Sequence, residues 1–235
     1  MATLLSFRDG VKNFCSKYDR FVSPLCKFIL AIVMFWSIEH LTGYNSMLSS
    51  FVVVLAAAFV CAFLSDSLTL AIGGLYACAQ VASASIELGI TFVIIFVIMY
   101  CVYIRFFPKS SWVIMFMPFL YIIKFAYFMP ILAGMFLGIV GMIPAAFGCI
   151  FYFFMKYTGD YMQLASTTPT DNIVEGYKYI FEHLVQDKTL LLTIIVFAVV
   201  IVLTYVIYRM SFAYSWYVAI VTGGIVEIVL FLVGT

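Results

Sequence analysis

The sequence predicts an all-α integral membrane protein, a polytopic helix bundle with about eight transmembrane helices. Apolar residues make up 66% of the 235 residues, and charged residues only 10%, whereas soluble domains carry about 25% charged residues. A soluble fold of this size would need a far more polar surface. The net charge of +1 provides no attraction to nucleic acid. We therefore expect the lipid bilayer as the surrounding medium and no nucleic-acid partner.

A helix of about 20 residues crosses the hydrocarbon core of a bilayer. The expected spans are apolar stretches of about this length. Polar or turn-forming residues separate them. We expect spans at 25–43, 47–64, 67–86, 88–107, 111–128, 130–156, 189–208 and 211–234. The chain then divides into an N-terminal surface segment (1–24), a bundle of about six spans (25–156), a loop (157–188) and two C-terminal spans (189–235).

The basic residues predict how this bundle is oriented, because Lys and Arg in short loops stay in the cytoplasm. If the N-terminus is cytoplasmic and each span crosses once, ten of the 12 Lys and Arg residues lie inside. Lys124 and Arg209 are the two that lie outside. This bias predicts a multi-pass protein of the plasma or inner membrane with both termini in the cytoplasm.

Two segments outside the spans have the spacing of amphipathic helices. In the first 24 residues, apolar side chains recur at helical intervals beside Arg8 and Lys12, which predicts a helix on the anionic inner leaflet or packed beneath the bundle. The second segment follows Thr170, a possible helix cap, in the cytoplasmic loop. It is either a connector on the membrane or a docking helix for a soluble partner, through an apolar stripe of Tyr177, Ile180, Phe181 and Leu184.

Small residues form a stripe in the expected span 130–156, "PILAGMFLGIVGMIPAAFGC". Helices in lipid associate through close backbone approach, which small residues permit. A proline within a span bends it, so the segment is either a tight packing surface or a hinge. The residues concerned are Gly134, Gly138, Gly141, Pro144 and Gly148.

Glu227 is the acidic residue within the last expected span. An acidic side chain at this depth costs about 2.5–3.5 kcal/mol on insertion scales, so it should face protein or water. Gly223 and Gly224 lie three or four residues before it and share its helix face, which we expect to be a helix-packing surface or a hinge. Three interpretations remain open: a neutral packing residue, a member of an ion or proton path, or the partner of a basic residue on another subunit.

Lys124 is the other unusual charge, in "FLYIIKFAYFMP". At the end of an expected span, its side chain either reaches the outer surface or, like Glu227, belongs to an ion, proton or intersubunit site. The sequence contains no motif of a metalloprotease, serine hydrolase, nucleotide site or metal cluster. We therefore expect no cofactor, no metal and no catalytic residue.

Two functions fit these features. The first is a non-catalytic membrane subunit of a transport or secretion assembly, in a homo- or hetero-oligomer with other membrane subunits. It is suggested by the small-residue contact stripes and by the helix available for docking. The alternative is a self-contained small transporter or channel that uses Glu227 for ion or proton coupling.

Overall fold

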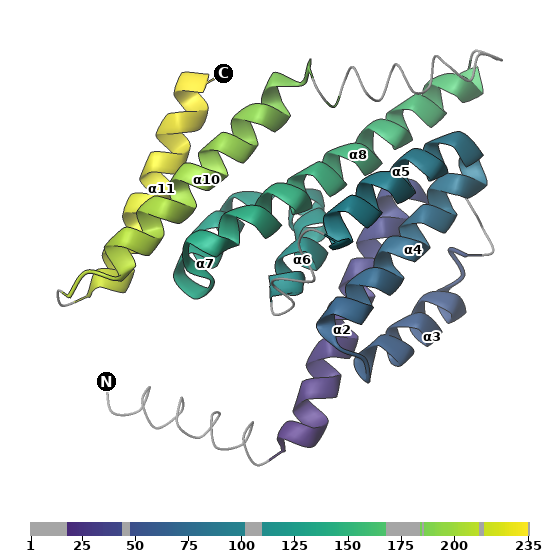
Figure 1. Cartoon of the computed structure of the whole chain (residues 1–235), viewed down its shortest axis with the longest axis horizontal. Coiled ribbons are helices and arrows are strands. Elements are labelled where there is room, and N and C mark those ends of the chain that lie inside the picture. The colour runs from purple at the N-terminus through teal and green to yellow at the C-terminus, as the bar shows by residue number, and fades with distance from the viewer. Residues whose placement is uncertain are drawn as a thin grey trace.

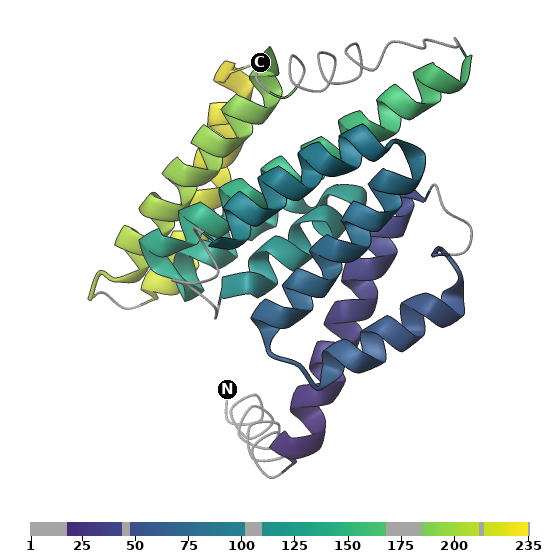
Figure 2. The ribbon, with the colours of Figure 1, turned by 45° about the vertical axis from the view of Figure 1, so that its right-hand side comes forward.

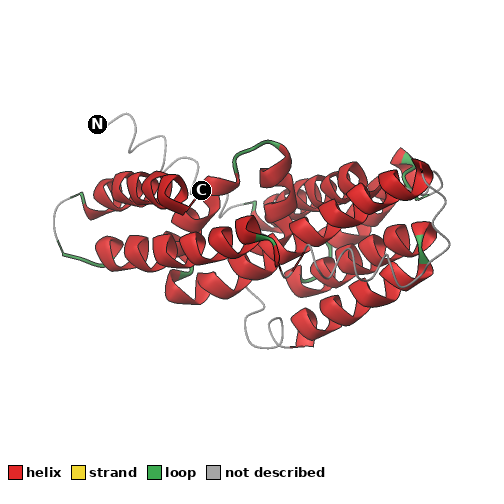
Figure 3. Cartoon of the chain, turned by 90° about the horizontal axis from the view of Figure 1, so that it is seen from above, coloured by secondary structure: helices red, strands yellow, loops and turns green. Residues whose placement is uncertain are grey.

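The computed structural model describes residues 18–43, 48–101, 110–167, 184, 186–211 and 214–234. Every regular element in these ranges is a helix (Figure 3). Large apolar side chains such as Phe51, Leu232 and Val233 are exposed on the outer faces of the helices. The all-α class is thus confirmed, and the apolar exterior indicates contact with a lipid bilayer.

The N-terminal half contains four helices. They are α2 (Asp19–Thr42), α3 (Phe51–Ala62), α4 (Asp66–Ala84) and α5 (Ile86–Met99). Of these, α3 and α4 pack against α2, and α5 packs against α4. The core between them is mainly aromatic and aliphatic, with Phe35, Phe92 and Phe154 fully buried. Lys27 of α2 binds the Asp66 carboxylate at 3.1 Å and the Leu64 carbonyl at 3.0 Å. It therefore holds the turn between α3 and α4 against α2.

The central segment contains α6 (Ser111–Ile122), a 3₁₀ turn (Ala126–Phe128), α7 (Met129–Phe136), a second 3₁₀ turn (Gly138–Gly141) and α8 (Met142–Thr167). The last two helices, α10 (Lys188–Tyr208) and α11 (Ser215–Gly234), form an antiparallel pair at one side of the bundle (Figures 1 and 2). Among the described residues, four helical segments are long and apolar enough to cross a membrane, at Arg20–Thr42, Gly138–Tyr161, Lys188–Tyr208 and Ser215–Gly234, and several shorter apolar helices accompany them.

The observed bounds differ from the expected spans in three places. The first long helix begins at Asp19, so its first turn lies in the segment expected on the surface. Helix α8 continues to Thr167 into the expected loop. The expected span 130–156 is not one helix, because Gly138 adopts a φ of +66° and the chain turns between α7 and α8. The eight crossings are therefore not confirmed.

The direction of α6 follows from its contacts with α8. Tyr121 stacks on Tyr152 with ring centroids 4.1 Å apart, and a side chain on Gly148 would meet Met117. Later residues of α6 thus contact later residues of α8, so the two helices are parallel. Helix α8 is antiparallel to α10, because Cys149 shares a core with Phe197 and Ile201 while the later Tyr157 packs on Leu190.

Helix α7 runs in the opposite direction to α6. At its start, Tyr127 contacts Phe231 near the end of α11, with ring centroids 5.1 Å apart. Beyond its end, Gly138 lies against Tyr205 near the end of α10. Helices α6 and α7 therefore form a hairpin, which enters and leaves at the same end of the bundle.

This α6–α7 hairpin is too short to cross a bilayer. Helix α6 has 12 residues and α7 has 8, which correspond to about 18 Å and 12 Å of helix, against a hydrocarbon core of about 30 Å. Its tip, residues 123–128, therefore ends within the length of the bundle, with Ile123, Phe125 and Tyr127 about half exposed. Such re-entrant segments are stable in membranes only where protein or water surrounds their irregular backbone.

The start of α10 is capped by Asp187. Its Oδ1 accepts a hydrogen bond of 2.8 Å from the Thr189 amide, and its Oδ2 accepts one from the Tyr157 hydroxyl of α8. Burial on its own raises the pKa of Asp187, but the hydrogen bonds from Tyr157 and Thr189 outweigh it and lower this pKa. The carboxylate therefore both caps α10 and fastens it to α8.

Stability in detergent should accordingly fall in acid through Asp187. Because its pKa is lowered on folding, its contribution is complete above the unfolded value of about 3.9 and is lost as the pH falls through the lower, folded value. Replacement by Asn retains the cap but not the charge. The thermal midpoint, followed by circular dichroism between pH 6 and pH 3, should decline less in Asp187→Asn than in the wild type, and equal declines would contradict this role.

Candidate functional site

A groove of about 640 Å³ lies between the tip of the α6–α7 hairpin and α11. We call it the tip groove. Both unusual charges of the sequence line it, Lys124 from the hairpin and Glu227 from α11. Aromatic side chains are half of the other lining residues, and the outer edge of the groove is exposed on the bundle surface. These aromatic residues are Phe125, Tyr127, Phe128 and Phe231.

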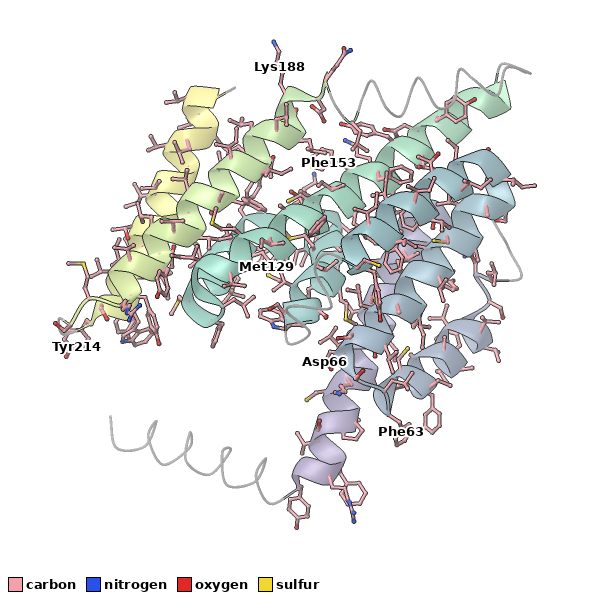
Figure 4. All side chains as sticks on the ribbon, viewed as in Figure 1. Phe63, Asp66, Met129, Phe153, Lys188 and Tyr214 are labelled. Atoms are coloured by element: carbon pink, nitrogen blue, oxygen red, sulfur yellow. The ribbon has the colours of Figure 1, made fainter. Side chains whose placement is uncertain are left out.

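The depth of the groove follows from the pairing of α10 with α11. Gly234 lies against Leu192, and Gly223 lies against Thr204. Along this antiparallel pair, Glu227 is therefore level with residue 200, near the middle of α10 (Lys188–Tyr208). Figure 4 shows Lys188 and Tyr214 at opposite ends of the pair. Glu227 thus lies far from either end of α10, while the exposed Lys124 lies nearer the Lys188 end, since the preceding Tyr121 packs near Leu190.

Lys124 occupies a backbone conformation that favours glycine, with a φ of 59°. The Phe125 amide bonds to the Leu120 carbonyl at 2.7 Å, and the Lys124 amide bonds to the Tyr121 carbonyl at 3.1 Å. This is the Schellman pattern that ends a helix, in which the left-handed position is usually glycine. A lysine there costs about 1 kcal/mol relative to glycine.

This position differs from the expectation for Lys124. The sequence interpretation placed it at the outer surface, at the end of a full span, and left Glu227 without a basic residue at its depth. Because α6 stops at Ile122 and the chain folds back, Lys124 instead lies at the hairpin tip, in the same groove as Glu227. Within the described residues, no ion pair joins their charged atoms.

Glu227 is 4% exposed, and its Oε1 has no hydrogen-bond partner in the described part of the chain. Thr204 of α10 is fully buried, and its Oγ1 also has no partner there. A buried polar atom without a partner is rare and costly. Among the described residues, the two buried side-chain atoms without a partner therefore lie on adjacent helices, α10 and α11.

Two of the predicted packing glycines converge on Thr204. A Cβ on Gly134 of α7 would lie 3.0 Å from the Thr204 Cβ and 2.8 Å from the Ile201 carbonyl oxygen. A Cβ on Gly223 would lie 2.9 Å from the Thr204 Oγ1. The missing side chains thus let α7, α10 and α11 meet at Thr204. Gly224, by contrast, has open space around it and lines the tip groove.

The other residues of the small stripe do not share one helix face. Gly141 lies against Ala133 and Leu137 inside the turn between α7 and α8, while Gly148 faces Met117 of α6. Pro144 is the third residue of α8, a position in the first turn where proline is tolerated. The chain therefore bends before Pro144, at Gly138–Gly141, and not at the proline.

The predicted docking stripe is only partly within the described residues. Tyr177, Ile180 and Phe181 lie outside them. Leu184 is half-buried and packs against the core residues Tyr157 and Leu190. The amphipathic N-terminal segment also lies outside the described residues, apart from the part that belongs to the start of α2.

Two features of this site were missing from the sequence interpretation, Thr204 and the aromatic wall. Thr204 is the one polar side chain in "AVVIVLTYV" apart from the tyrosine. A single threonine in an apolar span is a weak sequence signal for a site. The aromatic residues of 125–128 looked like the end of a span, because nothing in the local sequence indicates a reversal there.

Comparison with known proteins finds no family model, no curated protein and no solved structure that matches this chain. The class of the protein therefore rests on its own features. An all-helical bundle with long apolar helices, an apolar exterior and a charged groove at mid-depth defines a multi-spanning membrane protein. The helical structure, the length of the four longest helices and the apolar composition of the chain all agree with this class.

Proposed function

We propose that this protein is a membrane subunit of a transport or secretion assembly, in which another protein chain covers the tip groove. The observation that carries the proposal is a laterally open groove lined by Lys124 and Glu227, with Glu227 level with the middle of α10. A charge at this depth costs about 2.5–3.5 kcal/mol when it faces lipid. Covering by protein, with a water-accessible path beneath it, removes that cost.

The form of the α6–α7 hairpin supports a role in transport. In many transporters, broken helices meet near the middle of the membrane and form the site for solute or ion. Here the C-terminal end of α6 and the N-terminal end of α7 both adjoin the tip groove, through Lys124 and Phe128. The bundle thus has irregular backbone, charge and open volume at one place.

A self-contained transporter or channel is the second candidate, since the same hairpin provides a mid-membrane site within one chain. In that case the protein would act as a monomer, and lipid would cover the outer edge of the groove. The two candidates differ in what contacts Ile228, which is 63% exposed at the edge of the groove.

We expect a benzophenone amino acid at position 228 to crosslink to another protein chain in native membranes. The matched control is position 97 on α5, where Val97 is 50% exposed and outside the groove. It should crosslink to protein much less. Mass spectrometry of the adduct identifies the partner, and native mass in mild detergent should exceed the 26.5 kDa of one chain. A lone monomer that transports solute in liposomes would contradict the subunit proposal.

A further inference from the structure

We propose that Glu227 and Thr204 form a binding site for one monovalent cation, sodium or a proton, between α10 and α11. This inference rests on the proposed transport function and names the ion to which it is coupled. Its starting point is that Oε1 of Glu227 and Oγ1 of Thr204 are both buried and both without a hydrogen-bond partner in the described residues. Two buried and unpaired oxygens of this kind require an explanation, and a bound cation provides one.

The antiparallel pairing directs these two side chains toward each other. Thr204 lies opposite Gly223, one helical turn of about 6 Å from Glu227. Side chains on a helix lean toward its N-terminus, so Glu227 leans toward Gly223 and Thr204 leans toward residue 200. Because the helices are antiparallel, the Glu227 and Thr204 side chains both lean into the space between the level of Gly223 and the level of Glu227. Gly223, which has no side chain, leaves that space open.

The chemistry of the site selects a single positive charge. One carboxylate balances one monovalent cation, so that the occupied site is neutral in a medium of low dielectric constant. Carboxylate and hydroxyl oxygens are hard ligands that suit sodium. A proton on Glu227 gives the same neutrality, with Thr204 as its hydrogen-bond acceptor. The two ions thus share one site and compete for it.

The tip groove supplies both access and a replacement charge. Glu227 lines the groove, as does the ammonium-bearing Lys124. Across from Glu227, the hairpin also contributes the Tyr127 hydroxyl, while α7 (Met129–Phe136) and residues 196–204 of α10 bring no titratable or charged side chain. On α11 the other titratable group is Tyr217. Lys124 is therefore the positive charge that can neutralise Glu227 after the cation leaves.

The test is thermal unfolding of the full-length protein in detergent, in sodium chloride against choline chloride of equal ionic strength at pH 8.5. A specifically bound ion stabilises the folded state, so sodium should raise the midpoint by roughly 5 °C. If the ion is a proton, sodium has no effect and the midpoint falls between pH 6 and pH 9 at fixed salt. In either case Glu227→Gln should remove the response.

Three further variants separate a binding site from a packing effect. Thr204→Val keeps the shape but removes the oxygen, and it should weaken the response, whereas Thr204→Ser should retain it. Thr222→Val is the matched control, because the Thr222 hydroxyl already donates to the Val218 carbonyl at 2.6 Å, and it should behave like the wild type. A wild-type protein that responds to neither sodium nor pH overturns the site, as does a full response in Thr204→Val or Glu227→Gln.

These results are independent of the partner test. Crosslinking at position 228 reports whether another chain covers the groove, and it does not depend on the ion. A sodium or pH response without a partner would leave the site standing and remove the subunit proposal. A partner without any response would do the reverse.

Discussion

Gly134→Val is expected to lower the thermal midpoint of the protein in detergent by roughly 10 °C, or to prevent its accumulation in membranes. A Cβ at this position would lie 2.8 Å from the Ile201 carbonyl oxygen, which is backbone and cannot rotate away. Valine adds two more methyl groups at the same contact. Helices α7 and α10 must then separate, and overpacking of this kind costs about 1–3 kcal/mol or more.

The matched control for this change is Gly224→Val. Gly224 has nothing within 4 Å of the position where its Cβ would stand, and it lies on α11 one residue from the closely packed Gly223. We expect its midpoint to stay within about 2 °C of the wild type, because a surface substitution of this kind changes stability by roughly 0.5 kcal/mol or less. Equal losses in the two variants would show that valine harms these helices through propensity rather than through contact.

Separation of α7 from α10 should also disturb the tip groove. Gly134 and Gly223 hold Thr204 from two sides, and Ile131 of α7 lines the groove. A variant with alanine at position 134 would move the hairpin less than valine does. A graded loss of the sodium or pH response from glycine through alanine to valine would follow the same order as the loss of stability.

The sequence was sufficient to predict the long helices at the two ends of the chain. Expected spans 25–43, 189–208 and 211–234 overlap α2, α10 and α11 almost completely. In each case a polar or turn-forming residue stands at the boundary, such as Gly43 or Arg209. An apolar helix of this length has few alternatives in lipid, so composition alone defines it.

The central segment could not be predicted in the same way. Residues 111–156 are apolar nearly throughout, so hydropathy does not distinguish a crossing from a helix that turns back. The glycines of "FLGIVGM" fit a packing stripe as well as a break, and the φ of +66° at Gly138 decides between them. That conformation depends on the space beside Tyr205 of α10, which is tertiary information.

The candidate site was half predictable for the same reason. Glu227 stands out because acidic residues within spans are rare. Its proximity to Lys124 depends on the α6–α7 hairpin, and its relation to Thr204 depends on the register of α10 against α11. These are contacts between residues far apart in the chain, which periodicity and composition do not report.

Reporters fused to the two termini of the protein are expected to lie on opposite sides of the membrane. Helix α2 runs parallel to α6, because Leu30 adjoins Trp112 while the later Trp36 contacts Phe119. Helix α6 is parallel to α8 and therefore antiparallel to α10, so α2 and α11 run in the same direction. The start of α2 and the end of α11 thus lie at opposite ends of the bundle (Figure 1). Eight passes would instead place both termini on one side.

The measurement uses a pair of reporters, one that is fluorescent only in the cytoplasm and one that is active only outside it, each fused in turn to the N-terminus and to the C-terminus. A second readout is a single cysteine at Ile123, labelled from each side with a membrane-impermeant maleimide. The hairpin predicts labelling at a rate well below that of a cysteine at Ser211, beyond the end of α10, because position 123 lies at the tip of a hairpin that ends within the membrane. Termini on the same side, together with rapid labelling at 123, would mean that α6 and α7 cross the membrane, and the charges of the tip groove would then lie at its surface.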